Sequence, residues 1–366
     1  MITDLEYDGA AFWQAFKSSD CGQRYVFGTN EYADAVATRI ALDGFIDDFS
    51  SVKYRMGVPV IKLSDAAADC IVLSCVTANH AISALQKLRA AKIPRFADYY
   101  TVSAATNELP LVRQVAESRI DFGQNQSQYQ WIRARLFDDE SREVFDRVMA
   151  LRVESDLSSM ATFKYAPDRQ YFEPFFVTTA EEHFVDAGGF DGATTLEFAR
   201  RCPGYKRIDF FEPAQANLET ARAKLLRLPN VVFHEAGLYD DELELSFDPD
   251  AGSSSQLSKQ GTVRVRCVPL DHVVPSGVTF IKMDIEGAEL AALRGSERHI
   301  RRQSPKIAVA AYHRPGDFWR IPRFLLSLQP DYRVLLRHYT EGWAETVMYF
   351  IHPKDFIADG LGANRV

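Results

Sequence analysis

The chain has 366 residues, of which 46% are hydrophobic and 25% are charged, and its formal net charge is −8. A chain of this length is expected to form two or three domains with substantial cores. The acidic balance argues against the broad basic surface that nucleic-acid binding requires, so a nucleic-acid partner is not expected.

The cysteines and the hydropathy pattern bear on location. None of the five cysteines forms a C-x-x-C pair, and several lie inside apolar runs, which favours a reducing cytoplasm. The first residues, MITDLEYDGA, lack a basic segment followed by an apolar one, so no secretory signal is expected. No run of 18 apolar residues occurs, so no membrane span is expected. A homo-oligomer remains possible.

Strands and helices alternate over the first hundred residues. Strands are predicted at 24–28, 44–48 and 70–75, and an amphipathic helix at 80–92. Between the first two strands, Ala33, Val36, Ala37 and Ile40 follow helical spacing. This alternation predicts a small Rossmann-like α/β domain over residues 1–103.

The sequences YVFGTNEYADAV (25–36) and GFIDD (44–48) make this domain resemble the small Rossmann-like domain at the front of sugar-modifying enzymes, such as acyltransferases that act on nucleotide sugars. The usual glycine-rich phosphate loop is reduced to Gly28, followed by Thr29, Asn30 and Glu31. Two interpretations stay open, a nucleotide site or a structural or dimer-forming module, and the single glycine favours the second.

A helical connector is predicted over residues 104–166. Its clearest amphipathic piece is ESREVFDRVMALRV (140–153), in which Val144, Val148 and Leu151 share one face. The aromatic cluster YFEPFF (171–176) follows. Such a cluster usually lies in a core, although Tyr171 and Phe172 could line a substrate entrance. The last domain is expected over residues 167–366.

A glycine-rich turn opens the last domain. Residues 183–195 read HFVDAGGFDGATT, which predicts a strand that ends at a tight turn and then a helix. Gly188, Gly189 and Gly192 leave bare backbone N–H groups at the carboxyl end of the strand. Their spacing is not the G-x-G-x-x-G of dinucleotide folds, so pyrophosphate is not the expected ligand.

Glu212 ends the next apolar run, in FFEP (210–213). An acid at this point of a Rossmann-like sheet accepts hydrogen bonds from ribose hydroxyls. A turn that permits close approach, together with an acid for a ribose, suits S-adenosylmethionine. The alternative is an ordinary strand-to-helix turn with an incidental surface glutamate.

The rest of the domain continues as an open α/β sheet. Helices are predicted at 215–228, 288–300 and 317–328, and strands at 231–234, 243–247, 263–268, 278–283 and 306–311, with a Gly/Ser loop at 250–261. Two further strands, 332–336 and 346–351, have no helix between them. They can pair antiparallel at a sheet end, as a late hairpin that NAD-type folds lack.

The stretch IKMDIEGAE (281–289) carries two acids at the end of a buried strand. Ligands of open α/β sheets bind at this edge, so Asp284 and Glu286 are expected near the glycine turn. The alternative is that they cap the helix that follows. His313 ends the next strand and is expected beside Asp284.

The remaining histidines have weaker contexts. His338 and Glu345 flank the terminal hairpin and could reach the same edge. His234, next to Glu235 and Ala236, is expected near an adenine, and His183 and His299 are expected at the surface or in loops.

Taken in order, FVDAGGFDGATT, FFEP, FIKMDIEGAE, AAYHRPGDFWRIPRFL, LLRHY and ETVMY resemble the FkbM family of S-adenosylmethionine-dependent methyltransferases. The resemblance implies a class I methyltransferase fold and methyl transfer to oxygen, commonly on sugars, glycans or polyketide-like products. By motif position, Asp186, Gly188 and Gly192 would hold the methionyl part, Glu212 the ribose, and Asp284 would border the methyl. The other candidate cofactor-binding residues are Ala187, Phe190, Thr194, Glu235 and Ala236.

The expected reaction is an in-line displacement in which a substrate hydroxyl attacks the sulfonium methyl group. His313 is the expected base, Asp284 orients it or the acceptor, and Glu286 completes the catalytic set. A divalent cation on Asp284, Glu286 and His313 remains open, but no metal is predicted. The expected acceptor is a saccharide or another small molecule.

Two rival functions remain. One is an NAD-dependent sugar oxidoreductase that uses the first sheet, which the missing G-x-G-x-x-G weakens. The other is a non-catalytic binding protein that keeps the cofactor fold as a scaffold.

Overall fold

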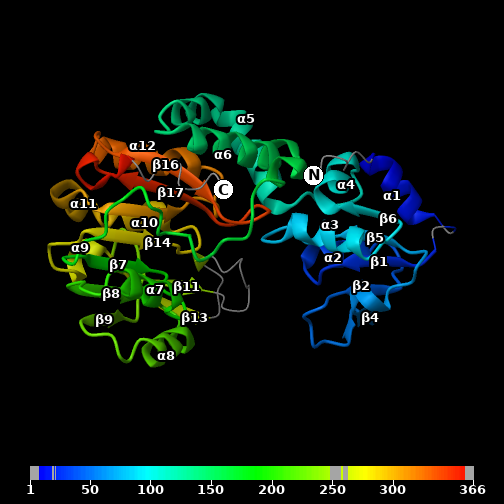
Figure 1. Cartoon of the computed structure of the whole chain (residues 1–366), viewed down its shortest axis with the longest axis horizontal. Coiled ribbons are helices and arrows are strands. Elements are labelled where there is room, and N and C mark those ends of the chain that lie inside the picture. Colours follow the sequence, from blue (N-terminus) through cyan, green and yellow to red (C-terminus); the bar gives the residue numbers. More distant parts are fainter. Residues whose placement is uncertain (1–7, 19, 21, 248–256, 259–262, 359–366) are drawn as a thin grey trace. The chain divides into compact units, whose positions relative to one another are not determined.

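The protein is represented by a computed structural model that describes residues 8–18, 20, 22–247, 257–258 and 263–358. The chain folds into two compact units (Figure 1). The first unit takes in Met1–Gln126, Glu143–Pro167 and His338–Glu345, and the second takes in Ser127–Arg142, Asp168–Arg337 and Thr346–Val366. Both units thus use part of the expected connector, and the three-domain division at 103 and 166 stays a prediction.

The first unit is built on a six-stranded sheet of order β3-β4-β2-β1-β5-β6. Its strands are β1 (Arg24–Phe27), β2 (Gly44–Ile46), β3 (Tyr54–Arg55), β4 (Val58–Ile61), β5 (Ile71–Ser74) and β6 (Arg95–Asp98). β1 pairs in parallel with β2 and with β5, and only the short β3 runs antiparallel to its neighbour among the described pairings. The predicted small parallel sheet is confirmed.

The helices of the first unit and of the connector complete this region. They are α1 (Gly9–Lys17), α2 (Glu31–Ala37), η1 (Leu63–Asp65), α3 (Ala81–Ala90), α4 (Tyr99–Ala105), α5 (Arg113–Arg133), α6 (Asp139–Met149), η2 (Ala150–Glu154) and η3 (Leu157–Met160). The sequence did not predict α1, a short helix capped by Asp8 that buries Trp13 and Phe16. Inside α5, Asn125 has non-helical backbone angles, immediately before the point where the chain passes to the second unit.

The second unit contains a seven-stranded sheet of order β16-β17-β15-β14-β7-β8-β9. Its strands are β7 (His183–Ala187), β8 (Arg207–Phe211), β9 (Val231–His234), β14 (Phe280–Met283), β15 (Lys306–Ala310), β16 (Arg333–His338) and β17 (Thr346–Ile351). The strands from β9 to β15 pair in parallel, and β17 pairs antiparallel with β15. This is a Rossmann-like sheet that ends in a late hairpin, as the sequence predicted.

A smaller four-stranded sheet of order β10-β13-β11-β12 belongs to the same unit. It consists of β10 (Gly237–Leu238), β11 (Leu243–Phe247), β12 (Leu257–Ser258) and β13 (Val263–Val268). Most of the predicted Gly/Ser loop at 250–261 lies outside the described residues.

The helices of the second unit are α7 (Ala193–Arg201), α8 (Gln215–Lys224), α9 (Leu270–Val273), α10 (Glu289–Arg294), α11 (Glu297–Gln303), α12 (Asp317–Leu328) and η5 (Pro353–Asp355). The single helix predicted at 288–300 is wrong, because α10 and α11 are separate. Between them, the buried Ser296 hydroxyl donates to the Ala292 carbonyl at 2.7 Å, a back-bond that bends helices. In the part of the chain that the structure describes, none of the helices is both long enough and apolar enough to cross a membrane.

The core of the second unit lies on its central strands. Every residue of β7, β14 and β15 is buried, as expected for parallel strands covered on both faces. The ring of Phe184 stacks on Phe198 at 4.1 Å and lies 5.0 Å from Phe280. This packing joins β7 and β14 near their amino ends and attaches α7 to them.

Candidate active site

Strand register brings three predicted residues to one edge of the sheet. Ala187, the last residue of β7, pairs with Met283 of β14 and with Phe211 of β8. The next residue of each strand is therefore Gly188, Asp284 or Glu212, all at the carboxyl edge. Gly188 donates its backbone N–H to Phe211 at 3.0 Å, and Asp284 donates to Ala187 at 3.1 Å.

Gly188 sits where a side chain has no room. Its φ is +73°, and a Cβ built there would lie 1.9 Å from the carbonyl oxygen of Asp284. Gly192, with φ +81°, precedes α7, and between the two glycines Phe190 also has a positive φ of 50°. The turn therefore presses its backbone directly against the end of β14.

Glu212 ties this turn to the end of β8. Its Oε2 accepts the backbone N–H of Phe190 at 3.0 Å, and its Oε1 accepts from Ala214 at 2.9 Å and Asn217 at 3.3 Å. Burial raises the pKa of Glu212, and these hydrogen bonds only partly oppose the rise. Each carboxylate oxygen has two lone pairs, so the group can accept hydrogen bonds from ligand hydroxyls as well.

Asp186 lies beneath the turn, where it is fully buried. The Thr195 hydroxyl donates to its Oδ2 at 2.6 Å, and the Lys282 ammonium lies 3.1 Å from its Oδ1. Lys282 also donates to the carbonyl of Gly188 at 2.7 Å. Asp186 therefore supports the turn from inside. Sequence reasoning missed Lys282, although a lysine in the apolar strand FIKM was a usable signal.

The other candidate cofactor-binding residues surround the same strand ends. Ala187 ends β7, Phe190 is 63% exposed at the tip of the turn, and Thr194 is half-buried in the first turn of α7. After β9, Glu235 is exposed and Ala236 is buried. Their roles toward a cofactor stay predictions.

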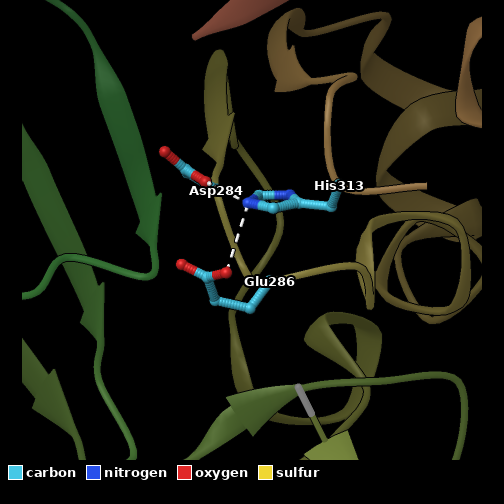
Figure 2. Close-up of side chains that lie close together, drawn as sticks. All are labelled: Asp284, Glu286 and His313. Atoms are coloured by element: carbon cyan, nitrogen blue, oxygen red, sulfur yellow. Dashed lines mark ion pairs between the residues drawn. The ribbon is translucent and has the colours of Figure 1, made fainter. Parts of the chain in front are cut away.

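The three predicted catalytic residues face one another (Figure 2). Asp284 and Glu286 follow β14, and His313 follows β15. The Nε2 atom of His313 lies 3.4 Å from Asp284 Oδ1 and 3.4 Å from Glu286 Oε2. Glu286 has a positive φ of 56°, which is rare for a residue with a long side chain. Adjacent strands thus gather these groups at the edge that carries Gly188.

Glu289 holds the other side of the imidazole. His313 Nδ1 lies 2.9 Å from Glu289 Oε1, which also accepts the backbone N–H groups of Ile285 and Gly287. The helix α10 begins at Glu289, and its N-cap residue is Ala288, whose side chain makes no capping hydrogen bond. Glu289 is fully buried and received no role from the sequence, although it ends the DIEGAE motif.

The cluster is strongly acidic. Burial lowers the pKa of His313, but Glu289, Asp284 and Glu286 together raise it to about 10. Burial and the charge of Glu289 also raise the pKa of Asp317 to about 7. The surrounding carboxylates thus favour the protonated imidazole, and the assignment of His313 as the base stays a prediction.

Two tyrosine hydroxyls complete the surroundings of Asp284. Tyr171 donates to Oδ2 at 2.7 Å, and Tyr312 donates to Oδ1 at 3.3 Å. Tyr171 is 5% exposed and has a positive φ of 72°. The sequence left two interpretations open for the aromatic cluster at 171–176, a place in the core or a place at a substrate entrance. The structure buries the ring and directs the hydroxyl to the candidate catalytic acid.

Two other histidines, His183 and His234, contact one buried acid, and the expected place of His234 near an adenine stays a prediction. His183 Nε2 lies 2.6 Å from Asp209 Oδ2, and His234 Nε2 lies 2.7 Å from Asp209 Oδ1. Burial would raise the pKa of Asp209, but bonds from Arg207 and both histidines hold it well below its usual range. The surface position predicted for His183 is wrong, because the fully buried Asp209 needs donors from the neighbouring strands.

Three further predicted positions have different outcomes. His299 is 1% exposed within α11, so its surface assignment is also wrong. His338 and Glu345 belong to the first unit, where the His338 ring lies 4.8 Å from Phe163. Burial lowers the pKa of His338 to about 3.

Comparisons with known proteins agree with this architecture. Residues 186–341 match the model of the Methyltransferase FkbM domain. Methyltransferase 1 of Beauveria bassiana (strain ARSEF 2860) is 27% identical over 169 residues, which cover 38% of this chain and 68% of that relative. The crystal structure of the methyltransferase FkbM from Methylobacillus flagellatus KT is similar with a TM-score of 0.72 and 22% identity, over 95% of this chain and 96% of that one.

The sheet order, the glycine turn and the acidic strand ends are those of a Rossmann-like fold that is similar to a methyltransferase structure. Residues 186–341 match the methyltransferase FkbM domain, which confirms the resemblance seen in the sequence.

Proposed function

We propose that this protein is an S-adenosylmethionine-dependent O-methyltransferase that acts on a hydroxyl of a saccharide, a glycan or a related natural product. The position of Gly188 carries the proposal. A Cβ at Gly188 would lie 1.9 Å from the carbonyl oxygen of Asp284, so the cofactor-type turn and the acidic cluster meet at one sheet edge. A methyl donor on the turn and an acceptor on the cluster would be neighbours there.

The residues present fit S-adenosylmethionine. Gly188 and Gly192 have left-handed backbone, and the space that a Cβ would fill is taken by the Asp284 carbonyl and by Leu225, so both glycines let the turn pack closely at this sheet edge. Glu212, held by Phe190 and Ala214, offers its carboxylate to ribose hydroxyls. Glu235 and Ala236 follow the next strand, where an adenine is expected.

The acceptor side consists of Asp284, Glu286 and His313. When bound, S-adenosylmethionine would supply a methyl group on a sulfonium: the acceptor oxygen would form the new carbon–oxygen bond, sulfur would keep the electron pair of the broken bond, and the hydroxyl proton would pass to water. The three side chains receive the hydroxyl and orient its oxygen.

A saccharide acceptor is the narrower part of the proposal. Its support is the first unit, whose largely parallel sheet carries the YVFGTNEYADAV and GFIDD stretches that resemble sugar-modifying enzymes. Saccharides present several hydroxyls, and the acidic cluster can accept hydrogen bonds from more than one of them.

Calorimetric titration of the full chain with S-adenosylmethionine tests the cofactor. A panel of saccharides, nucleotide sugars and non-sugar alcohols, read by mass spectrometry for one added methyl group, tests the acceptor. Absence of cofactor binding would overturn the proposal as a whole. Cofactor binding with methylation of non-sugar alcohols alone would overturn the saccharide assignment.

His313→Ala tests the acceptor side. We expect turnover to fall by about 10²–10⁴-fold, the usual contribution of a group that assists proton transfer, while cofactor affinity changes little. The control is Glu297→Gln, which removes one acid from an exposed ion pair with Arg301. Wild-type turnover in His313→Ala would exclude the residue from catalysis.

A further inference from the structure

We propose that Asp284, Glu286 and His313 together bind one divalent metal ion, and that this ion holds the acceptor hydroxyl. The site would take Mn²⁺ or Mg²⁺, which accept carboxylate ligands and, in the case of Mn²⁺, readily also an imidazole. The inference rests on the function proposed above, because it gives the acceptor side of the same site a specific means of binding oxygen.

The spacing of the three side chains fits ligands of a common ion. One ligand atom from each residue lies within 4.8 Å of the others. His313 Nε2 is 3.4 Å from a carboxylate oxygen of Asp284 and 3.4 Å from one of Glu286. A charge-assisted hydrogen bond would measure about 2.7–2.9 Å, whereas ligand atoms that lie about 2.1 Å from one ion are about 3.0–3.4 Å apart.

The orientation of His313 is a second and separate observation. Its Nδ1 is engaged by Glu289 at 2.9 Å, on the side of the ring away from Asp284 and Glu286. Histidines that bind metals almost always donate their other N–H to a carboxylate or a carbonyl, which fixes the tautomer and directs the free nitrogen at the ion. The fully buried Glu289 supplies this support.

The charge balance favours a cation at the same point. Asp284, Glu286 and Glu289 bring three carboxylates around one imidazole. The hydroxyls of Tyr171 and Tyr312 donate to Asp284, but they add no positive charge. Asp284 and Glu286 are partly exposed, at 21% and 36%, so an ion can reach them, and a divalent ion would offset the excess of acid.

The ion would assist the reaction by binding the acceptor oxygen. Coordination lowers the pKa of a bound hydroxyl, so its proton passes to water more readily. The oxygen then forms the bond to the methyl carbon, and the electron pair of the broken carbon–sulfur bond stays on sulfur. His313, with both nitrogens engaged, would act as a ligand.

Binding of Mn²⁺ to the full chain, after chelator treatment and without cofactor or acceptor, tests this site. We expect calorimetry to give one Mn²⁺ for each chain, and electron paramagnetic resonance to show nitrogen coupling from an imidazole. Mg²⁺ should compete. Glu289→Gln should weaken Mn²⁺ binding by about 10–100-fold, because it removes only the support of the ligand.

Variants of the ligands complete the test. His313→Gln should abolish the nitrogen coupling. Asp284→Asn should abolish the stoichiometric binding of Mn²⁺. The control Glu297→Gln should retain both the coupling and the binding. Melting temperatures of all variants identify any that fail to fold. If a ligand variant fails to fold, Glu289→Gln still tests the site, because it leaves the three ligands in place. Absence of Mn²⁺ binding, or binding unchanged in Asp284→Asn and Glu289→Gln, would overturn the proposal.

A parallel titration with S-adenosylmethionine separates the two proposals. Cofactor binding without Mn²⁺ binding would overturn the metal site and leave the methyltransferase function in place. Loss of cofactor binding would overturn the function itself, whatever the result with Mn²⁺.

Discussion

The turns after β1 and after β7 both lead from a parallel strand into a helix, but different groups hold them. In the first unit, the turn after β1 is closed by its own side chains: Thr29 donates to Asp47 at 2.7 Å, and Asn30 both caps α2 and donates to Cys75 at 2.7 Å. In the second unit, the turn after β7 contains glycines, and Glu212 holds it by one backbone N–H. Asp47 and Glu212 each accept three hydrogen bonds, but only the second turn is built on a glycine that packs against the end of a neighbouring strand.

The acids at the ends of the second strands show the same difference. Asp47 accepts from Thr29, Phe49 and Ser50, and although burial opposes them, these bonds lower its pKa. Burial outweighs the bonds to Glu212 and raises its pKa. A buried carboxylate with a raised pKa is a candidate for ligand binding, so this difference favours a ligand site at the turn after β7 over one at the turn after β1.

The largest expected effect comes from Gly188→Ala. The new Cβ would meet the Asp284 carbonyl at 1.9 Å, so the strand ends must separate. We expect cofactor affinity to fall by more than about 100-fold and stability by more than about 2 kcal/mol. Calorimetry and chemical denaturation measure the two losses.

Gly28→Ala is the matched change in the first unit. Its Cβ would have only ordinary contacts at 3.6 Å, so the cost is the positive φ of 113°, about 1–2 kcal/mol. Cofactor affinity should stay at the wild-type value. If Gly188→Ala and Gly28→Ala lowered cofactor affinity equally, the proposed difference between the two turns would be wrong.

A smaller effect is expected from Glu212→Gln. Loss of the charged acceptor should lower the affinity for S-adenosylmethionine by about 10–100-fold, which is the usual contribution of hydrogen bonds to a charged group. Asp47→Asn should leave the affinity unchanged, since Asp47 serves only its own turn. Weakening by both changes would show that the first unit also contributes to cofactor binding.

The raised pKa of Glu212 predicts a pH dependence of cofactor affinity. Above this pKa the carboxylate is charged and the affinity is constant. As the pH falls through it, protonation removes the acceptor and the affinity drops, beginning at a higher pH than the ordinary glutamate value of about 4.3. Dissociation constants measured across this range should converge for wild type and Glu212→Gln at low pH, and parallel curves would contradict the assignment.

The smallest effect is expected from Thr29→Val. It removes the hydroxyl that bonds Asp47, at a cost of about 1 kcal/mol of stability, without any change in cofactor affinity. Because the folded pKa of Asp47 is lowered, this stability is present above the unfolded value of about 3.9 and is lost as the pH falls through the folded pKa. Denaturation at neutral and acidic pH should show the difference shrink on acidification.

Much of the second unit was predictable from local pattern. Apolar runs with polar ends located β7, β8, β14 and β15, and the parallel arrangement then placed Gly188, Glu212, Asp284 and His313 at one edge. Each of these residues ends or follows a strand, so topology alone determines their position.

The residues that the sequence missed depend on contacts between distant segments. Glu289 meets His313 across 24 positions, and Tyr171 meets Asp284 across 113. Nothing in the periodicity of either segment specifies such a pair. The same reason explains His183 and His234, whose partner Asp209 looks like an ordinary strand residue until three strands are aligned. The split between α10 and α11 falls at Gly295 and Ser296, where the Ser296 hydroxyl donates to the Ala292 carbonyl, and the helical periodicity does not show it.

The hairpin between β16 and β17 has a consequence for how this chain can be divided. Its connecting residues His338–Glu345 belong to the first unit, where Glu341 accepts the backbone N–H and hydroxyl of Ser83, both at 2.7 Å. The chain passes between the units five times. A fragment starting at residue 168 would expose this loop without its partners, so the methyltransferase half is not a module that one cut can release.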